Sequence, residues 1–262
     1  MLRKNIEEVI KVKEKTKKAL IITALSLVLV GLVLYIAAEL GAFKKGDKLQ
    51  GIRKELTAVE LTRLMGNGIN LGNTMEAYGH ASLGTNAAVS SYETLWGQPV
   101  TTQEMITAMK KSGFDTIRIP VAWTNTMNFE SGDYTIREDW FARIEEIVGY
   151  AMNENMYVIV NDHWDGSWWG MFGSATAETR QKAMDMYISM WTQIAERFKN
   201  YSDYLIFESA NEELGDRLND QDIAKDSGTL STNECYEITN KINQTFVDTV
   251  RATGGNNGQR FL

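Results

Sequence analysis

The sequence predicts an α/β protein built on a parallel sheet, and two observations lead to that class. From about residue 56 onward, apolar runs of four to seven residues alternate with longer segments of helical periodicity, the pattern of repeated strand–helix units. The 262 residues are 44% hydrophobic with 2 Pro and 1 Cys, which excludes collagenous, disordered and disulfide-stapled classes. Strands that alternate with helices form parallel sheets covered by those helices.

The expected elements follow one another along the chain. Continuous apolar runs predict strands, and helical periodicity predicts the segments between them. Thr101 or Thr102 is a candidate cap for the first helix, and Gly254 with Gly255 ends the last one. Residues 260–262 have the character of an opening fifth strand. The expected strands are 68–71, 115–121, 157–161 and 204–208, and the expected helices are 102–112, 139–153, 176–198 and 232–252.

Two parallel architectures fit this order, an open doubly wound sheet and a (β/α)8 TIM barrel. A dinucleotide-binding open sheet needs Gly-x-Gly-x-x-Gly, and the glycine pair at 66 and 68 has Leu71 where the third glycine belongs. Polar side chains at the carboxyl ends of successive strands are typical of a barrel's active face. They occur in or just after every expected strand: Asn70 and Asn73, Arg118, Asn161 and His163, then Asn211 and Glu212. We therefore expect a barrel.

The N-terminal forty residues differ from the rest. Residues 1–18 are basic, and residues 19–38 carry no charge over twenty positions, enough helix to cross a hydrocarbon core of ~30 Å. We predict a cytoplasmic segment at 1–18, a transmembrane anchor at 19–40, a linker at 41–55 and the barrel from 56 to 262. A cleaved signal peptide is the alternative, in which case the protein is secreted. With the anchor retained, the positive-inside rule places the catalytic domain outside the cell.

Charge and composition exclude several functions. Residues 51–262 carry a net charge of −12, which disfavours binding to nucleic acid. With one cysteine, Cys235, and two histidines, a structural zinc site has too few ligands. Asp162, His163 and Asp165 would have to lie on one face to bind a metal ion, but side chains at adjacent positions of an extended chain point in different directions. We expect neither a metal nor a cofactor.

One candidate catalytic carboxyl stands out. Glu212 follows the fourth expected strand beside Asn211, where a carboxyl group can act as a general acid and an amide can contact a sugar hydroxyl. A capping asparagine and a solvated glutamate would give the same dipeptide. Arg118, within an apolar strand, needs a carboxylate partner, which is either part of a site or a structural ion pair. His163 is either a site residue or a hydrogen-bonded structural histidine.

The seven tryptophans suggest a carbohydrate ligand, because flat aromatic faces suit the apolar faces of sugar rings. Packing is the alternative, and we expect it for Trp140 and Trp191, which lie within helices. Together with the amides Asn73 and Asn161, the loop tryptophans are the predicted substrate-binding residues: Trp96, Trp123, Trp164, Trp168 and Trp169.

Five motifs occur in order on the expected strands and the loops that follow them. They are Asn70-Leu71-Gly72-Asn73-Thr74, Glu93-Thr94 with Trp96-Gly97 and Pro99, Arg118-Ile119-Pro120-Val121 with Trp123, Asn161 with His163, and Phe207-Glu208 with Asn211-Glu212. As a set they resemble glycoside hydrolase family 5, the cellulase family of retaining barrels. The resemblance runs from about residue 66 to 262 and is strongest to endoglucanases acting on β-1,4-glucans.

The resemblance implies a role for each matched residue. Glu212 would be the general acid/base, Asn211 the partner of the sugar 2-hydroxyl, Arg118 the support of the nucleophile, and His163 a substrate-binding group. The sequence departs from the family pattern at Trp164, where many members have a second histidine, at Glu213, where proline is usual, and at Ile69, where tryptophan is common.

The family's nucleophilic glutamate follows a seventh strand, so its position is expected beyond Leu262. We therefore expect the barrel to be truncated after the start of its fifth strand and inactive as it stands. The resemblance implies a glycoside hydrolase that cleaves internal β-1,4-glucosidic bonds in polysaccharide degradation, and the uncharged run at 19–38 predicts that it is anchored in a membrane. The alternative is a carbohydrate-binding pseudoenzyme anchored in the same way.

Overall fold

The computed structural model describes residues 51–262, so the predicted basic segment, the anchor at 19–40 and the linker up to residue 50 lie outside the described residues. Between residues 51 and 262, no helix combines the length and apolarity that a membrane crossing requires. Arg53, within the predicted linker, is held by the domain: its Nε donates to Asp203 Oδ2 at 2.9 Å and its Nη2 to the Tyr157 hydroxyl at 2.9 Å.

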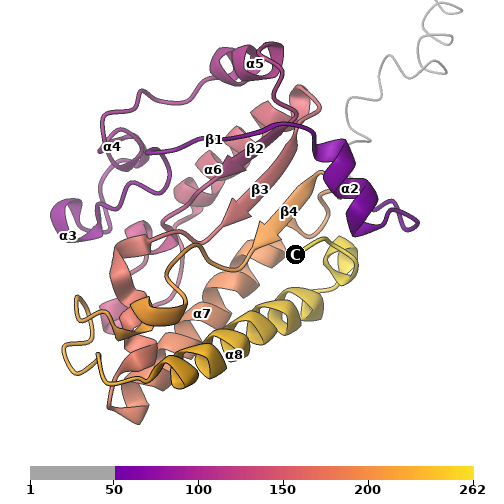
Figure 1. Ribbon diagram of the computed structural model, residues 1–262. Coiled ribbons are helices and arrows are strands. Elements are labelled where there is room, and N and C mark those ends of the chain that lie inside the picture. The colour runs from indigo at the N-terminus through magenta and orange to yellow at the C-terminus, as the bar shows by residue number, and fades with distance from the viewer. Residues whose placement is uncertain (1–50) are drawn as a thin grey trace, which may run out of the picture. The chain divides into compact units, whose positions relative to one another are not determined.

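Four parallel strands form one sheet in the order β1-β2-β3-β4 (Figure 1). The α/β class and the parallel sheet are therefore confirmed. Asn70 pairs with Arg118 across β1 and β2, and Asn161 pairs with Glu208 across β3 and β4, so the carboxyl ends meet at one edge. The strands are β1 (Gly68–Asn70), β2 (Thr116–Ile119), β3 (Tyr157–Asn161) and β4 (Leu205–Glu208).

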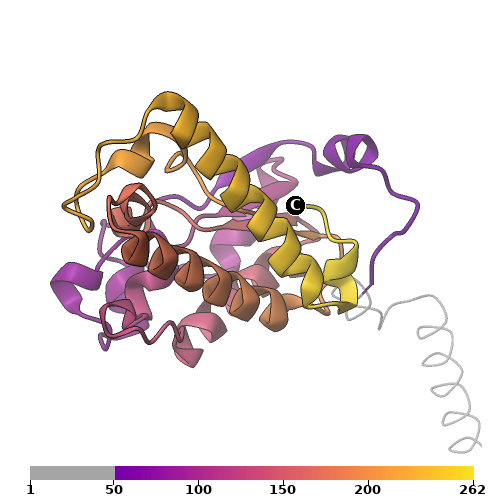
Figure 2. The ribbon, with the colours of Figure 1, turned by 90° about the horizontal axis from the view of Figure 1, so that it is seen from below.

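All four predicted helices are present, with ends within one residue of the expected positions. They are α5 (Gln103–Lys111), α6 (Glu138–Asn153), α7 (Ala177–Phe198) and α8 (Thr232–Ala252). Thr102 caps α5 by accepting the Met105 N–H, and Ser231 forms a capping box with Glu234 at the start of α8. Helices α7 and α8 run side by side (Figure 2).

Short elements fill the connections between these units. The sequence pattern did not predict them, because three to nine residues are too few to show a helical period. They are the α-helices α2 (Ala58–Met65), α3 (His80–Leu83) and α4 (Val89–Glu93), and the 3-10 helices η2 (Trp123–Thr126), η3 (Phe129–Ser131), η4 (Asp165–Gly173), η5 (Gly215–Asn219) and η6 (Gly255–Gly258).

Two expected strands differ in extent by more than one residue. The strand predicted at 115–121 ends at Ile119, because Pro120 has no N–H to donate to a sheet. Residues 260–262 are not assigned as a strand, yet the Phe207 N–H donates to the Phe261 oxygen at 3.4 Å. The chain therefore runs along β4 there without completing a ladder.

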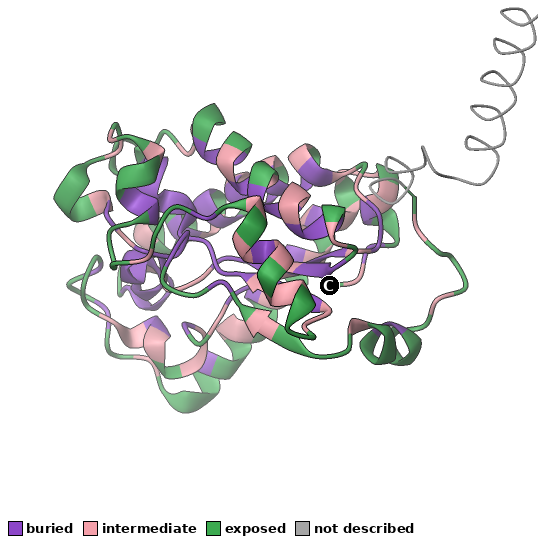
Figure 3. Cartoon of the chain, turned by 90° about the horizontal axis from the view of Figure 1, so that it is seen from above, coloured by how far each residue is buried: buried purple, intermediate pink, exposed green. Residues whose placement is uncertain are grey.

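The two faces of the sheet have different environments. Ile117, Val158, Val160 and Phe207 lie in the main hydrophobic core, which also contains side chains of α5 to α8. Arg118, Ile159 and Glu208 alternate with these core residues and are half-buried, whereas most residues of β2, β3 and β4 are buried (Figure 3). Trp140 and Trp191 are fully buried in the core, which confirms their expected packing role.

Candidate active site

A charged cluster lies at the carboxyl end of β2 and β4. Arg118 Nε donates to Glu208 Oε2 at 2.7 Å, and its Nη2 donates to Glu208 Oε1 at 3.0 Å and to Asn211 Oδ1 at 2.9 Å. The parallel register brings these residues together although they are about ninety positions apart. The two-pronged pairing fixes the guanidinium plane, and the amide oxygen of Asn211 is oriented by the same group.

The loop after β4 presents Glu212 to solvent while burying its neighbour. The Asn211 N–H donates to Glu213 Oε2 at 3.1 Å, and Glu213 is 1% exposed. Burial raises the pKa of the Glu213 carboxyl. Glu212 itself is exposed. The buried carboxyl therefore fixes the turn that carries the predicted acid/base.

His163 lies half-buried beside this cluster. Its backbone N–H donates to the Val121 oxygen at 2.9 Å, and Asn161 Nδ2 lies 3.3 Å from His163 Nδ1. Because an amide nitrogen only donates, Nδ1 accepts and the ring proton is on Nε2. Burial, with the positive charge of Arg118, lowers the pKa of His163 to about 4, against the opposing charges of Glu208 and Glu212. The ring is neutral at physiological pH.

The loop after β1 adds a residue that the sequence analysis missed. Asn73, a predicted substrate-binding residue, is exposed and has a left-handed backbone with φ of 62°. Glu76 holds this turn by accepting the Thr74 N–H at 2.9 Å and the Asn73 N–H at 2.5 Å. Burial raises the pKa of Glu76, although Arg118 opposes that effect. The only sequence signal for Glu76 was a carboxyl group just after the first-strand motif.

Aromatic rings form an accessible patch beside His163. The ring centroids of Trp96 and Trp164 lie 6.4 Å apart, and the edge of Tyr78 meets Trp164 at 5.5 Å. Trp96 is 41% exposed and Trp164 is half-buried, so both have surface for a ligand. Tyr78, which the sequence analysis did not select, stacks on His80 at 6.0 Å. Their role in substrate binding stays a prediction.

Four predicted substrate-binding residues need correction. Trp168 and Trp169 are 0% and 1% exposed and pack against Phe172 and Tyr187, so they have no face for a sugar ring. Trp123 is fully buried, and its Nε1 donates to the Asn161 oxygen at 2.9 Å. Asn161 is also fully buried beside His163. These four side chains therefore pack inside the domain and are not accessible to a ligand.

Residues 51–262 contain no group of three or more acidic, histidine or cysteine side chains arranged to hold a metal ion. The groups gathered at the strand ends are instead a fixed guanidinium, an oriented amide, a neutral imidazole and exposed carboxyl groups. Such a set can hold hydroxyl groups and transfer a proton.

The arrangement defines an α/β protein with a polar site at the carboxyl ends of parallel strands, and the comparisons give its family. The profile described as Cellulase (glycosyl hydrolase family 5) matches residues 79–260. The chain belongs to this family. The resemblance seen in the motifs is thereby confirmed, and the predicted eight-stranded barrel is the fold of the family, of which residues 51–262 form four successive strand–helix units.

Similar proteins include several endoglucanases. Endoglucanase A of Ruminococcus albus is 39% identical over 209 residues, covering 80% of this chain and 52% of that protein. A xyloglucan-specific endo-beta-1,4-glucanase of Bacteroides ovatus is 37% identical over 209 residues, covering 80% of this chain and 39% of that protein.

Solved structures give the same result. A broad-specificity endoglucanase from Clostridium longisporum matches with a TM-score of 0.65 and 36% identity, over 78% of this chain and 55% of that one. Another, from Ruminococcus champanellensis with bound cellotriose, matches with a TM-score of 0.66 and 36% identity, over 79% of this chain and 56% of that one. The chain thus spans about half the length of these relatives.

Proposed function

We propose that this chain carries the acid/base part of a retaining glycoside hydrolase site that cleaves internal β-1,4-glucosidic bonds of cellulose or related β-glucans. The observation that carries the proposal is the cluster of Arg118, Glu208 and Asn211 beside the exposed Glu212, in a chain of a family whose similar members are named endoglucanases.

Each group has a role that follows from its chemistry. Glu212, exposed at the strand end, would protonate the glycosidic oxygen as the bond breaks. Asn211, with its oxygen held by Arg118, has its Nδ2 free to orient toward a sugar hydroxyl. Neutral His163 would hydrogen bond through Nε2–H, and Trp96 with Trp164 would stack on sugar rings.

A retaining reaction also needs a second carboxyl group about 5–5.5 Å from the acid/base. Three other glutamates lie in or beside the matched motifs, and each is already engaged. Glu93 is 1% exposed in an ion pair with Arg143, Glu76 accepts two backbone N–H groups, and Glu208 is paired with Arg118. We therefore expect the 262 residues to bind β-glucan with negligible turnover.

Binding and turnover measured together test this proposal. We expect the 262-residue chain to bind cellotriose, and Trp96→Ala or Trp164→Ala to weaken binding by roughly tenfold, since stacked aromatic contacts are worth about 0.5–1.5 kcal/mol beyond area burial. Tyr236→Ala, at an aromatic residue of α8 that is 60% exposed, is the matched control. Absence of binding, or equal binding by all variants, would refute a glycan site here.

Turnover then decides the role of Glu212. If soluble cellulose derivatives are cleaved, Glu212→Gln should lose about 10²–10⁴-fold on substrates with poor leaving groups and much less on activated aryl glycosides. Equal loss on both substrates would remove Glu212 from the acid/base role. Turnover abolished by Glu208→Gln would point to Glu208 as the second carboxyl group.

One observation favours the carbohydrate-binding pseudoenzyme as a second candidate. The resemblance to the family implies that Arg118 supports a nucleophile, whereas in this structure its Nε and Nη2 both donate to Glu208. Glycan binding with no hydrolysis of soluble cellulose derivatives or of activated aryl glycosides, and no effect of Glu212→Gln on affinity, would support that candidate over the enzyme.

We also propose that residues 19–38 anchor the protein in a membrane with the domain outside the cell. The support is the uncharged twenty-residue run after a basic segment. We expect the protein in the membrane fraction and its domain open to protease added outside. A soluble product that begins near residue 39 or 43 would instead indicate a cleaved signal peptide and secretion.

A further inference from the structure

Two aspartates in the segment after β3 are completely buried, and the proposed mechanism uses neither. Asp162 and Asp165 are both 0% exposed and lie on either side of His163 and Trp164, which belong to the candidate site. Charged carboxylates this deep in a protein require compensation by cations or several hydrogen bonds. The two residues differ in the number of hydrogen bonds that their carboxyl oxygens accept.

Asp165 is surrounded by donors. The Thr124 N–H lies 3.1 Å from both of its oxygens, the Thr124 hydroxyl donates at 2.6 Å, and Trp168 Nε1 donates at 3.3 Å. These bonds suit an ionised carboxylate. They also hold an unusual backbone, because Asp165, Gly166 and Ser167 are all left-handed, with φ of 47°, 74° and 62°.

Gly166 shows how closely this turn is packed. A Cβ atom at that position would lie 2.1 Å from Cζ of Tyr78, so the Tyr78 ring rests directly on the glycine. The turn thereby sets the position of Tyr78, whose ring edge meets Trp164.

Asp162 has no such donors. Neither of its oxygens accepts a hydrogen bond from an N–H group or a hydroxyl of the described residues. Its carboxyl group hydrogen bonds to the Asp165 carboxyl. Two ionised carboxylates cannot share a hydrogen bond, so the contact requires a proton, and the group without other donors is the one that holds it.

The surroundings of the pair supply negative charge rather than positive. The negative charge of Glu213, after β4, disfavours ionisation of Asp162, and the nearby Tyr187 of α7 donates its hydroxyl to the Ser209 oxygen rather than to Asp162. On the other side of the pair, burial together with the negative charges of Asp165 and Glu130 raises the pKa of Tyr78. The cation Arg217 lies near Glu213, where its charge opposes the larger effect of burial on the pKa of Glu213.

We propose that Asp162 is protonated and donates a hydrogen bond to Asp165, and that this buried carboxyl pair positions the turn that carries His163 and Trp164 in the candidate site. The pair itself does not depend on the proposed function; only its effect on glycan binding does. Burial, followed by the charge of Asp165, raises the pKa of Asp162 well above its usual value, and burial raises that of Asp165 to about 6.

The proposal fixes the sign of a pH effect. A carboxyl group whose pKa is raised on folding binds its proton more tightly in the folded chain, so its contribution to stability is full below the unfolded value of about 3.9 and is lost as pH rises through the folded value. Loss of the proton from Asp162 would place two negative charges in contact, and we expect the turn to loosen.

Asp162→Asn tests whether the side chain at position 162 donates the hydrogen bond to Asp165. The asparagine amide still donates to Asp165 but cannot ionise, so we expect the variant to be at least as stable as the wild type at pH 8. Between pH 4 and 9 its thermal unfolding midpoint should fall less, with a linkage slope smaller by up to about one proton per molecule. Titrating groups outside the pair contribute equally to both proteins and cancel in the difference, whereas the titration of Asp165 belongs to the pair and is part of the measured change.

Two further variants of the 262-residue chain serve as comparisons. Asp162→Ala removes the donor and should lower the midpoint at every pH. Asp185→Asn removes an exposed carboxylate of α7 and should leave the pH slope unchanged. If Asp162→Asn is as unstable as Asp162→Ala, or if its slope equals that of the wild type, the proposal is overturned.

Wild-type protein provides a direct readout that does not depend on any variant folding. We expect the infrared carbonyl absorption of a protonated carboxyl group at pH 7, and its absence would also overturn the proposal. Cellotriose binding should be kept by Asp162→Asn and weakened by Asp162→Ala. If wild type binds no cellotriose while the slope and the infrared band are as expected, the proposed function fails and the carboxyl pair stands.

Discussion

Arg118 links most of the candidate site through a single guanidinium. Its side chain is only 18% exposed, so its charge needs a partner, and Glu208 supplies one through both of its oxygens. The same group orients Asn211 and, through its positive charge, disfavours a proton on His163. Arg118 of β2 therefore orients the side chains at and after the end of β4 and favours the neutral form of His163 in the loop after β3.

The charge state of His163 can be measured directly, because the sequence has only two histidines. Burial and Arg118 lower its pKa to about 4, so we expect its ring resonances in a pH titration by NMR to shift near pH 4. A histidine with a lowered folded pKa contributes stability that is full above about 6.5 and is lost as pH falls toward 4. His163→Gln assigns the signal, and a midpoint near 6.5 would contradict the neutral ring.

At the scale of elements, long periodic segments were predictable and short ones were not. Helices α5 to α8 and strand β3 agree with the sequence because their apolar periodicity is continuous. The 3-10 helix η4 contains Trp168 and Trp169, which the sequence predicted to be substrate-binding residues. Its three left-handed residues fold the segment back onto α7, and no pattern of polar and apolar residues encodes that reversal.

The same limit applies to the site. Arg118, Asn211 and Glu212 were predictable because a charged or polar group at the end of an apolar strand is a local signal. Glu76 and the Asp162–Asp165 contact depend on turn geometry, and the pairing of Arg118 with Glu208 depends on strand register. Those are tertiary features that a single sequence does not display.

The connection between α4 and α6 offers a stability test at this scale. Glu93, at the end of α4, is 1% exposed; it accepts Arg143 Nε at 2.9 Å and the Thr101 N–H at 2.7 Å. Glu93→Gln leaves Arg143 with only Glu146 as its ion-pair partner, so we expect a loss of about 3 kcal/mol and a melting midpoint lower by roughly 6–12 °C.

The control for that test is an exposed pair on α7. Glu196 meets Lys199 at 2.7 Å, with both side chains more than a third exposed, and Glu196→Gln should cost at most about 1 kcal/mol. Equal midpoints for the two variants in differential scanning calorimetry would show that the buried pair does not tie α4 to α6.

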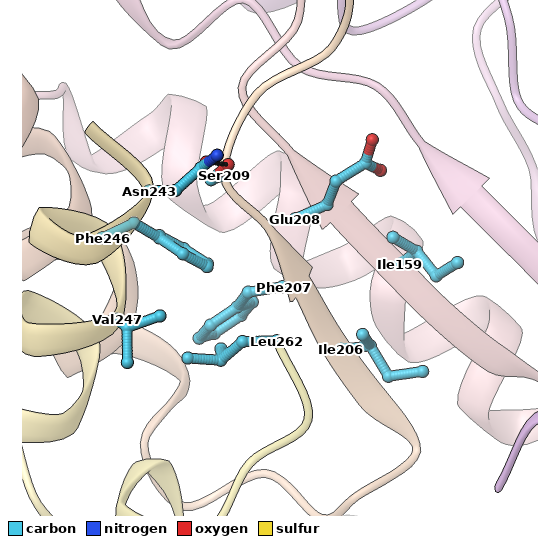
Figure 4. A pocket seen from close by; sticks show the side chains of 9 residues that line it. All are labelled: Ile159, Ile206, Phe207, Glu208, Ser209, Asn243, Phe246, Val247 and Leu262. Carbon is cyan, nitrogen blue, oxygen red and sulfur yellow. Dashed lines mark hydrogen bonds between the residues drawn. The ribbon is translucent and has the colours of Figure 1, made fainter. Parts of the chain in front are cut away.

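For the domain as a whole, the decisive feature is the edge of the sheet formed by β4. One face is closed by helices, whereas beside β4 an apolar pocket of about 470 Å³ remains open (Figure 4). Its lining includes Ile159, Ile206 and Phe207 from the strands, Phe246 and Val247 from α8, and Leu262. Apolar surface of this kind attracts hydrophobic ligands.

We therefore expect a hydrophobic fluorescent dye to bind beside β4. Because residues 19–38 are also apolar, the readout is the difference between variants rather than total fluorescence. Ile206→Asn puts an amide in the pocket, and since an unpaired buried amide costs about 1–3 kcal/mol, dye affinity should fall by at least about fivefold. Val59→Asn, at a position of α2 that is 62% exposed, should have no effect. Unchanged dye binding by Ile206→Asn would mean that the pocket beside β4 is closed in solution.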